Sequence, residues 1–306
     1  MAINSSRDNR IGSHDPLYDK VTGAYLGLAV GDALGATVEF MTAREIRTSL
    51  GRHDTMRGGG WLHLKRGQVT DDTTMALALG ASILQQGRVD AHSVAEAFSN
   101  WLREKPVDIG NTVRRGIVHY RYSGNPEAPE SEFDAGNGAA MRCLPIALCM
   151  VGQTSDRIKA SARVQAHVTH NNAVSDAACE CIIAMVQSAL AGDDKARILN
   201  GPVSSLLRIY PQYEFHKKRC ETPSAYIVET LQAVFQAFFD TDSFSDCLVD
   251  VVNRGGDADT TGAIAGMIAG SYYGISSIPR DWLQALDRDI YSACEAQALG
   301  LYRLCG

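Results

Sequence analysis

The sequence lacks the features that mark several large classes of protein. Its eight cysteines include no CxxC pair, and most lie in apolar helical stretches, so we interpret them as reduced core residues of a cytosolic protein rather than a disulfide framework. It has no excess of basic residues, because 29 Lys and Arg stand against 35 Asp and Glu for a net charge of −6. This balance argues against sequence-independent binding to nucleic acids, which needs a phosphate-neutralising surface.

The sequence also shows no secretory signal and no convincing membrane span. Residues 1–17 are polar and of mixed charge, and we expect a disordered tail there, followed by one domain over residues 18–306. The stretch from Val21 to Val38 is the most apolar candidate, but it has Asp32 in its middle and four glycines. We therefore expect a buried helix of a soluble, cytoplasmic protein.

Helical periodicity dominates the rest of the chain, and we find no series of alternating strands. The predicted helices span residues 20–38, 72–86, 92–103, 139–151, 155–166, 173–191, 225–239, 244–253, 260–273 and 281–299. Two long connections, residues 122–138 and 200–224, interrupt them, and long loops in compact domains tend to be functional. The sequence predicts a single, mostly helical domain.

Two of the predicted helices carry glycine at every fourth residue. The first has Gly23, Gly27, Gly31 and Gly35, and the other has Gly262, Gly266, Gly270 and Gly274. Glycine costs about 1 kcal/mol relative to alanine in a helix interior, so these ridges require a reason, and close approach of two helices supplies one. We expect both helices at the crowded centre of the bundle. If they pack against each other in antiparallel orientation, Glu39 would lie beside Asp257 and Asp259.

Two acidic clusters, TDDTT at residues 70–74 and DADTT at residues 257–261, each lie directly before an Ala/Gly-rich helix. The simpler interpretation is capping, since Asp and Thr are favoured at helix N-termini. One aspartate per helix meets that need, and two would repel each other without a cation. Oxygen ligands suit Mg²⁺ or Mn²⁺ without distinguishing them, and four aspartates suit a pair of ions.

Six segments resemble the ADP-ribosylglycohydrolase family. They are GAYLGLAVGDALGATVEF (23–40), GQVTDDTTMALAL (67–79), DIGNTVRRG (108–116), GNGAAMR (136–142), VTHNNA (168–173) and NRGGDADTTGAIAG (253–266). The resemblance covers about residues 20 to 275. The stretches EFMT (39–42) and GGGWLHLKRGQVTDDTTMALALG (58–80) are most similar to the branch that acts on the iron protein of nitrogenase.

The resemblance implies an all-α fold, a single-domain orthogonal helical bundle with a central dinuclear site for two divalent cations, Mn²⁺ or Mg²⁺. By motif, the metal ligands would be Thr70, Asp71, Asp72, Asp257, Asp259 and Thr260. Glu39 would be a ligand or would hold the attacking water. Asp108 would contact the departing guanidinium group or act as an acid/base group.

The implied reaction is hydrolysis of the bond between ADP-ribose and a protein arginine. By resemblance, the target is dinitrogenase reductase, and a PII-type nitrogen regulatory protein would control the enzyme and recruit it reversibly to the membrane. The alternatives are an enzyme for another ADP-ribosylated acceptor and a non-catalytic ADP-ribose-binding member of the fold. The helical isoprenoid synthases fit poorly, because Met75 stands where their DDxxD motif has its third carboxylate.

Several residues are candidates for binding the ADP-ribose group. Gly110-Asn111-Thr112 and Gly136-Asn137-Gly138, the latter opening a predicted helix, could cradle the diphosphate with main-chain amides or could be ordinary turns. Tyr213 or Tyr210 could stack on adenine, although lone aromatics more often pack in the core. His170 could pair with His167 on a metal, but we expect it to orient the loop or the substrate. The basic run Lys217-Lys218-Arg219 is either a solvated face or a docking site for an acidic partner.

Overall fold

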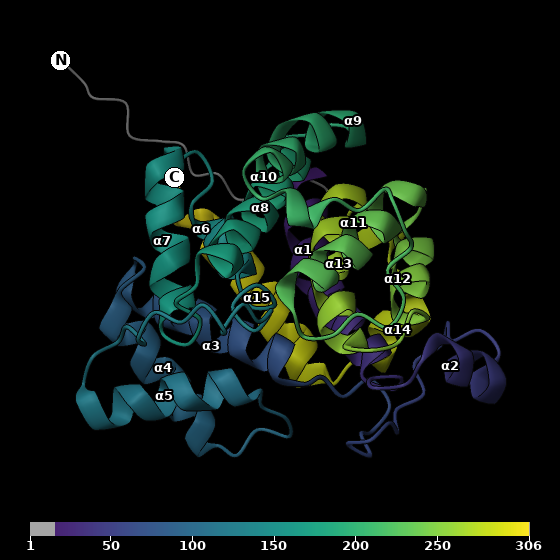
Figure 1. The fold of residues 1–306 in the computed structure, drawn as a ribbon, viewed down its shortest axis with the longest axis horizontal. Coiled ribbons are helices and arrows are strands. Elements are labelled where there is room, and N and C mark those ends of the chain that lie inside the picture. The colour runs from purple at the N-terminus through teal and green to yellow at the C-terminus, as the bar shows by residue number, and fades with distance from the viewer. Residues whose placement is uncertain (1–15, 306) are drawn as a thin grey trace.

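The computed structural model describes residues 16–305 and is built of helices (Figure 1). They are α1 (Pro16–Gly35), α2 (Ala43–Leu50), α3 (Asp71–Gln86), α4 (Ala91–Arg103), α5 (Asn111–Ser123), α6 (Leu144–Cys149), α7 (Ser155–His167), α8 (Ala173–Leu190), α9 (Lys195–Ile198), α10 (Ser204–Ile209), α11 (Ile227–Asp240), α12 (Phe244–Val252), α13 (Ala258–Tyr273), α14 (Arg280–Ala285) and α15 (Arg288–Arg303), with the short segments η1 (Leu199–Val203), η2 (Pro211–Tyr213) and η3 (Ile275–Ser277). Over residues 16–305 there are isolated β-bridges but no β-strand. This confirms the predicted all-α, single-domain fold.

Helices α1 and α13 lie antiparallel at the centre of the bundle, as their glycine ridges predict. A Cβ atom placed on Gly31 would lie 2.0 Å from the carbonyl oxygen of Gly262, and one on Gly266 would lie 2.0 Å from that of Gly27. No side chain fits at such distances, so the two backbones touch directly. The residues of α1 from Val21 onward are all buried, which confirms that this apolar stretch is a core helix.

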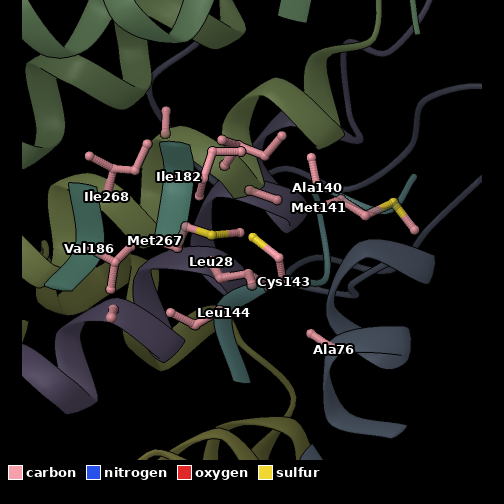
Figure 2. Close-up of a cluster of buried hydrophobic side chains, with 14 of the residues drawn as sticks. Leu28, Ala76, Ala140, Met141, Cys143, Leu144, Ile182, Val186, Met267 and Ile268 are labelled. Carbon is pink, nitrogen blue, oxygen red and sulfur yellow. The ribbon is translucent and has the colours of Figure 1, made fainter. Parts of the chain in front are cut away.

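The hydrophobic core extends from this pair to the helices around it. Figure 2 shows side chains of Leu28 from α1, Ala76 from α3, Leu144 from α6, Ile182 from α8 and Met267 from α13 meeting in one cluster. Packing on all sides explains why α1 and α13 have no polar face. Among the described residues, α8 alone is long and apolar enough to cross a bilayer by length and composition, and 61% of that span is buried in the core.

Two predicted helices differ from the structure by more than a shift of a few residues at their ends. The helix predicted over residues 139–151 forms only over Leu144–Cys149, because residues 138–142 are turns. The helix predicted over residues 281–299 is two helices, α14 and α15. Leu286 is extended at ψ 145°, and the Asp287 side chain accepts hydrogen bonds from two N–H groups at the start of α15, so the chain ends one helix and caps another.

Several helical segments were not predicted, among them α2, α5, α9 and those within residues 200–224. α2 has a capping box in which Thr42 and Glu45 bond each other's main chain, a pattern visible in the sequence. α5 begins directly after the Gly110 loop. The connection predicted over residues 200–224 contains part of η1, then α10 and η2, and its prolines Pro202 and Pro211 gave the appearance of a loop.

Other predictions concern the cysteines and the N-terminal tail. All eight cysteines are free, and six are buried, in line with reduced core residues. The predicted tail over residues 1–17 lies outside the described residues up to Asp15, while Pro16 and Leu17 already belong to α1.

Candidate metal and active site

The N-terminus of α3 presents the first acidic cluster and is held by Asp32 of α1. The fully buried Asp32 carboxylate accepts hydrogen bonds from the main-chain N–H groups of Thr70 at 3.0 Å and Thr73 at 3.1 Å, and from their hydroxyls at 2.9 and 2.5 Å. These donors satisfy the first turn of the helix. The side chains of Asp71 and Asp72 therefore do not cap α3, and helix capping does not explain why two acidic residues are present here.

The N-terminus of α13 presents the second acidic cluster. Asp257 precedes this helix but makes no side-chain cap. Its Oδ2 accepts a hydrogen bond of 2.6 Å from the Asn137 amide instead. The Thr260 hydroxyl lies 3.3 Å from Asp72 Oδ2, to which it donates. That contact joins clusters that lie 188 residues apart in sequence.

Glu39 and Asp108 complete the cluster from two loops. Carboxylate oxygens of Glu39, Asp108 and Asp259 all lie within 4.8 Å of one another. The expected approach of Glu39 to the start of α13 is therefore present. The Trp61 indole N–H donates to Glu39 Oε2 at 2.6 Å and orients this carboxylate.

Burial and mutual repulsion raise the pKa of these carboxyl groups. Desolvation is the largest cause, with the neighbouring carboxylates adding to it, and together they raise the pKa of Glu39 and of Asp71 to about 8. The same causes hold the pKa of Asp72 and Asp259 well above the usual range. Ionising several carboxyl groups that are buried together is energetically unfavourable unless a cation binds among them.

One orphaned atom tests whether a cation fits here. Asp72 Oδ1 is buried and has no hydrogen-bond partner, whereas buried carboxylate oxygens normally have one. The atoms around it that could coordinate a metal ion are carboxylate and hydroxyl oxygens, which hard divalent cations prefer as ligands. The cluster can therefore hold a metal ion.

The acidic cluster opens into a cavity of about 660 Å³. Five of its carboxylates line this cavity, together with loop segments from four parts of the chain: Glu39, Asp71, Asp108, Asp257 and Asp259, then residues 109–113, 136–138, 222–225 and 256. A volume in this range suits a drug-sized or nucleotide-sized molecule.

His170 lies against the glycine loop of the cavity. A Cβ atom on Gly138 would lie 2.8 Å from the His170 ring, so glycine is needed for the ring to pack there. Burial lowers the pKa of His170 to about 3, so the imidazole is neutral. Its Nδ1 lies 2.8 Å from the Thr169 hydroxyl, and the buried Arg142 donates to that same hydroxyl.

Some residues predicted to cradle phosphate are engaged in other contacts. The Asn137 N–H donates to the Ala225 carbonyl, and its side chain holds Asp257, so it positions a carboxylate. Gly138 is in a turn and does not open a helix, which corrects that prediction. Gly110, Asn111 and Thr112 line the cavity at the start of α5, and the Gly110 N–H lowers the pKa of Asp71.

The predicted adenine contact from Tyr213 is wrong for this structure. Tyr213 is fully buried, does not line the cavity, and donates its hydroxyl proton to the Val174 carbonyl. Tyr210, the other candidate, packs against the core instead of lining the cavity. Both residues lie where a helical segment replaces the predicted loop.

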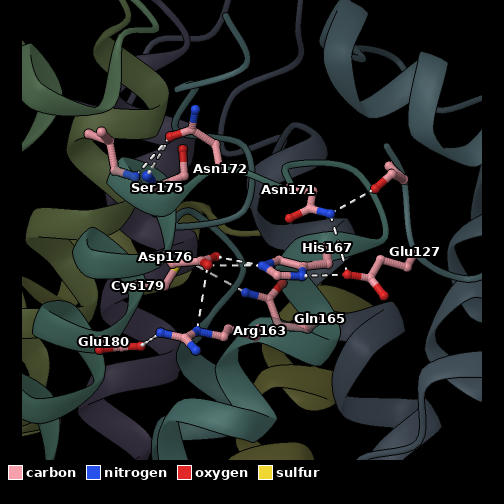
Figure 3. A network of polar contacts seen from close by, with 12 residues as sticks. Glu127, Arg163, Gln165, His167, Asn171, Asn172, Ser175, Asp176, Cys179 and Glu180 are labelled. Atoms are coloured by element: carbon pink, nitrogen blue, oxygen red, sulfur yellow. Dashed lines mark hydrogen bonds and ion pairs between the residues drawn. The ribbon is translucent and has the colours of Figure 1, made fainter. Parts of the chain in front are cut away.

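His167 does not pair with His170 on a metal. Figure 3 shows His167 between Asp176, at 2.9 Å, and Glu127, at 3.2 Å, in a separate polar network. The basic run is partly paired, since Arg219 bonds Glu221 and Asp250.

Sequence reasoning missed three residues of this region. Asp32 stood out only as a charge inside an apolar helix, although a buried acid in such a place requires donors. Phe40 and Trp61 lie within segments that carry the family resemblance, but nothing else in the sequence distinguishes them.

The comparisons with known proteins agree with one another. The model of the ADP-ribosylglycohydrolase family matches residues 13–305. The chain is 48% identical over 290 residues to ADP-ribosyl-[dinitrogen reductase] glycohydrolase of Rhodospirillum rubrum, covering 95% of this chain and 98% of that protein. It is 34% identical to the ADP-ribosylarginine hydrolase Tri1 of Serratia proteamaculans, over 88% of this chain and 75% of that protein. A solved ADP-ribosylglycohydrolase-related protein complex is similar with a TM-score of 0.84 and 35% identity, over 95% of this chain and 99% of that one.

Proposed function

Because this chain belongs to the ADP-ribosylglycohydrolase family, we propose that it hydrolyses the N-glycosidic bond between ADP-ribose and an arginine of a modified protein. The observation that carries the proposal is the meeting of two non-capping acidic clusters with Glu39 and Asp108 at the wall of one cavity. The names of the R. rubrum and S. proteamaculans relatives support arginine as the acceptor. The former supports dinitrogenase reductase as the protein, which the reaction would restore to its unmodified form.

Two divalent cations, Mn²⁺ or Mg²⁺, are the proposed cofactors. The residues that would hold them share oxygen donors and a place at a helix start: Thr70, Asp71, Asp72, Asp257, Asp259 and Thr260. When bound, such ions polarise water and orient sugar hydroxyls. Asn137, through Asp257, would keep the second cluster in position.

The reaction breaks the bond from the anomeric carbon to a guanidinium nitrogen, and water supplies a hydroxyl to the carbon and a proton to the nitrogen. The transition state resembles an oxocarbenium ion. Asp108 is half-buried, and burial raises the pKa of its carboxyl group. This group would supply the proton that the departing nitrogen needs. Glu39 lies within 4.8 Å of it and would hold the attacking water and accept its proton.

The rest of the cavity would bind ADP-ribose. The segments around Gly110 and Gly138 supply main-chain groups for the diphosphate, with Asn111 and Thr112 at the start of a helix that favours anions. The neutral His170 would orient the same group by a hydrogen bond.

We further propose, from the resemblance, a cytoplasmic enzyme that binds a PII-type regulatory protein and reaches the membrane through such a partner. Co-purification of the chain with a PII protein, at low and at high ammonium, tests this proposal. Binding that is absent in both states would rule it out while leaving the hydrolase proposal intact.

The direct test of function compares two substrates. Purified protein with Mn²⁺ should release ADP-ribose from ADP-ribosyl-arginine and leave ADP-ribosyl-serine unchanged. Chelation, or Asp257→Ala in a protein with a native circular dichroism spectrum, should abolish release. Equal release in all conditions would refute the proposal, and release only from the serine compound would reassign the acceptor.

A further inference from the structure

Two large aromatic side chains are exposed at the cavity. Phe40 is 64% exposed and Trp61 is 49% exposed, and both line the cavity that holds the acidic cluster. Their ring centroids lie 5.3 Å apart with an angle of 51° between the ring planes. Large apolar side chains grouped at a cavity are more often a binding surface than an accident of folding.

Each ring has a defined position: main-chain contacts fix Phe40, and a hydrogen bond to Glu39 fixes Trp61. Phe40 has φ 63°, a conformation unfavourable for a bulky residue and typical of functional sites. Its N–H donates to the Gly256 carbonyl at 2.7 Å, directly before the second acidic cluster. The Trp61 N–H donates to Glu39, so this indole keeps a defined orientation toward the carboxylate.

The position of the pair limits what it can contact. In ADP-ribosyl-arginine, the group attached to the anomeric carbon is the guanidinium group, whereas adenine lies beyond a ribose, two phosphates and a second ribose. In the proposed reaction, Asp108 gives a proton to the departing guanidinium nitrogen, and its carboxylate lies within 4.8 Å of that of Glu39. The aromatic pair beside Glu39 therefore lies within reach of the guanidinium group rather than of adenine.

The chemistry of the pair matches that group. A guanidinium ion is planar and cationic, stacks on aromatic faces and pairs with carboxylates. Phe40 and Trp61 offer π faces, and Asp108 offers a carboxylate within 4.8 Å of that of Glu39. We propose that Phe40 and Trp61 form the subsite for the guanidinium group of the modified arginine, an inference that rests on the proposed hydrolysis of ADP-ribosyl-arginine.

The test uses Phe40→Leu and Trp61→Leu in the full chain, with Phe133→Leu as the matched control, because Phe133 is 95% exposed and does not line the cavity. The KM for ADP-ribosyl-arginine should rise about 5-fold in each cavity variant, the size of a cation–π contact at a partly exposed site. The Kd for free ADP-ribose, which has no guanidinium group, should stay at the wild-type value by calorimetry. The control should change neither quantity.

A fourth variant separates the ring from its hydrogen bond. Trp61→Phe keeps an aromatic face and removes the N–H to Glu39, so it should keep KM near the wild-type value and lower kcat. Wild-type KM in both leucine variants would overturn the subsite, and an equal loss of ADP-ribose affinity would assign the pair to the nucleotide. A wild-type protein that releases no ADP-ribose from ADP-ribosyl-arginine would overturn the proposed function, and the subsite with it.

Discussion

Thr73 of α3 donates two hydrogen bonds to Asp32 of α1, one from its main-chain N–H at 3.1 Å and one from its hydroxyl at 2.5 Å. Asp32 is fully buried, and through this contact the central helix sets the position and the capping of α3. α1 also touches α13 along its glycine ridge. One helix thus aligns the N-termini of the two helices that present the acidic clusters.

Replacing Asp32 should therefore weaken both the fold and metal binding. Asp32→Asn presents an amide N–H₂ group to donors and loses a charge-assisted bond, so the free energy of unfolding should fall by about 2–3 kcal/mol. Misplacement of Asp71 and Asp72 should weaken Mn²⁺ binding about 10–100-fold. Urea unfolding and calorimetric Mn²⁺ titration measure these effects. Asp19→Asn is the matched control, since Asp19 is on the same helix and bonds Ser276 remote from the site; equal effects in both variants would contradict the account.

The contact between α1 and α13 should tolerate no side chain. In Gly31→Ala the new Cβ would lie 2.0 Å from a main-chain oxygen of Gly262, so the helices must separate, at a cost of about 3 kcal/mol or more. Thermal unfolding should show the loss. Gly201→Ala is the control, because a Cβ on Gly201 meets open space. A Gly31→Ala protein as stable as this control would refute the close packing.

The dependence of stability on pH should differ between the metal-free and the metal-bound protein. Glu39 and Asp71, whose pKa values are raised to about 8, bind protons in the folded state at pH values where the unfolded chain has released them. Metal-free stability should therefore fall as pH rises from about 4 to 8, because the folded protein must release protons that the unfolded chain has already lost. Bound Mn²⁺ replaces those protons and should remove or reverse the decline.

Thermal unfolding at pH 5.5 and pH 8, in EDTA and in Mn²⁺, measures this difference. The double variant Glu39→Gln with Asp71→Asn serves as the control, and its metal-free decline should be flatter. A metal-free wild-type protein that gains stability between these pH values would show that the carboxyl groups are not protonated as described.

Asp108 should act in catalysis without being needed for nucleotide binding. Asp108→Asn removes the proton donor to the leaving nitrogen and should lower kcat for ADP-ribosyl-arginine about 10²–10⁴-fold. The Kd for ADP-ribose should change little, since in the proposed mechanism this carboxyl group acts on the bond that the product no longer has. Steady-state kinetics measures kcat and calorimetry measures the Kd for ADP-ribose. A loss confined to ADP-ribose affinity would make Asp108 a binding residue only.

The sequence predicted the parts of the site that depend on periodicity and local motifs. The four-residue spacing of Gly23 to Gly35 and of Gly262 to Gly274 predicted the central helix pair, because only close backbone contact offsets the cost of glycine in a helix. From that pairing followed the approach of Glu39 to Asp259. These inferences used short-range patterns with a single physical explanation.

The rest depended on contacts between distant segments that no local pattern reveals. The sequence around Asn137 fits a phosphate cradle or an ordinary turn, but the Asn137 amide reaches Asp257, 120 residues away. The prolines of residues 200–224 predict a long loop that contains Tyr213, whereas the segment around this residue folds into short helical turns that bury the ring. Trp61 reaches Glu39 through a loop whose path is set by tertiary contacts. Contacts of this kind can be identified only once the three-dimensional fold is known.

The central claim is that the starts of α3 and α13 together hold a pair of divalent cations, and anomalous diffraction from crystals soaked in Mn²⁺ tests it most directly. The account predicts two anomalous peaks about 3.5–4 Å apart, lying between the carboxylates of Asp72 and Asp257, with one of them bonded to the now unpartnered Asp72 Oδ1. Anomalous peaks for Mn²⁺ elsewhere on the protein, with none between the carboxylates of Asp72 and Asp257, would contradict this claim.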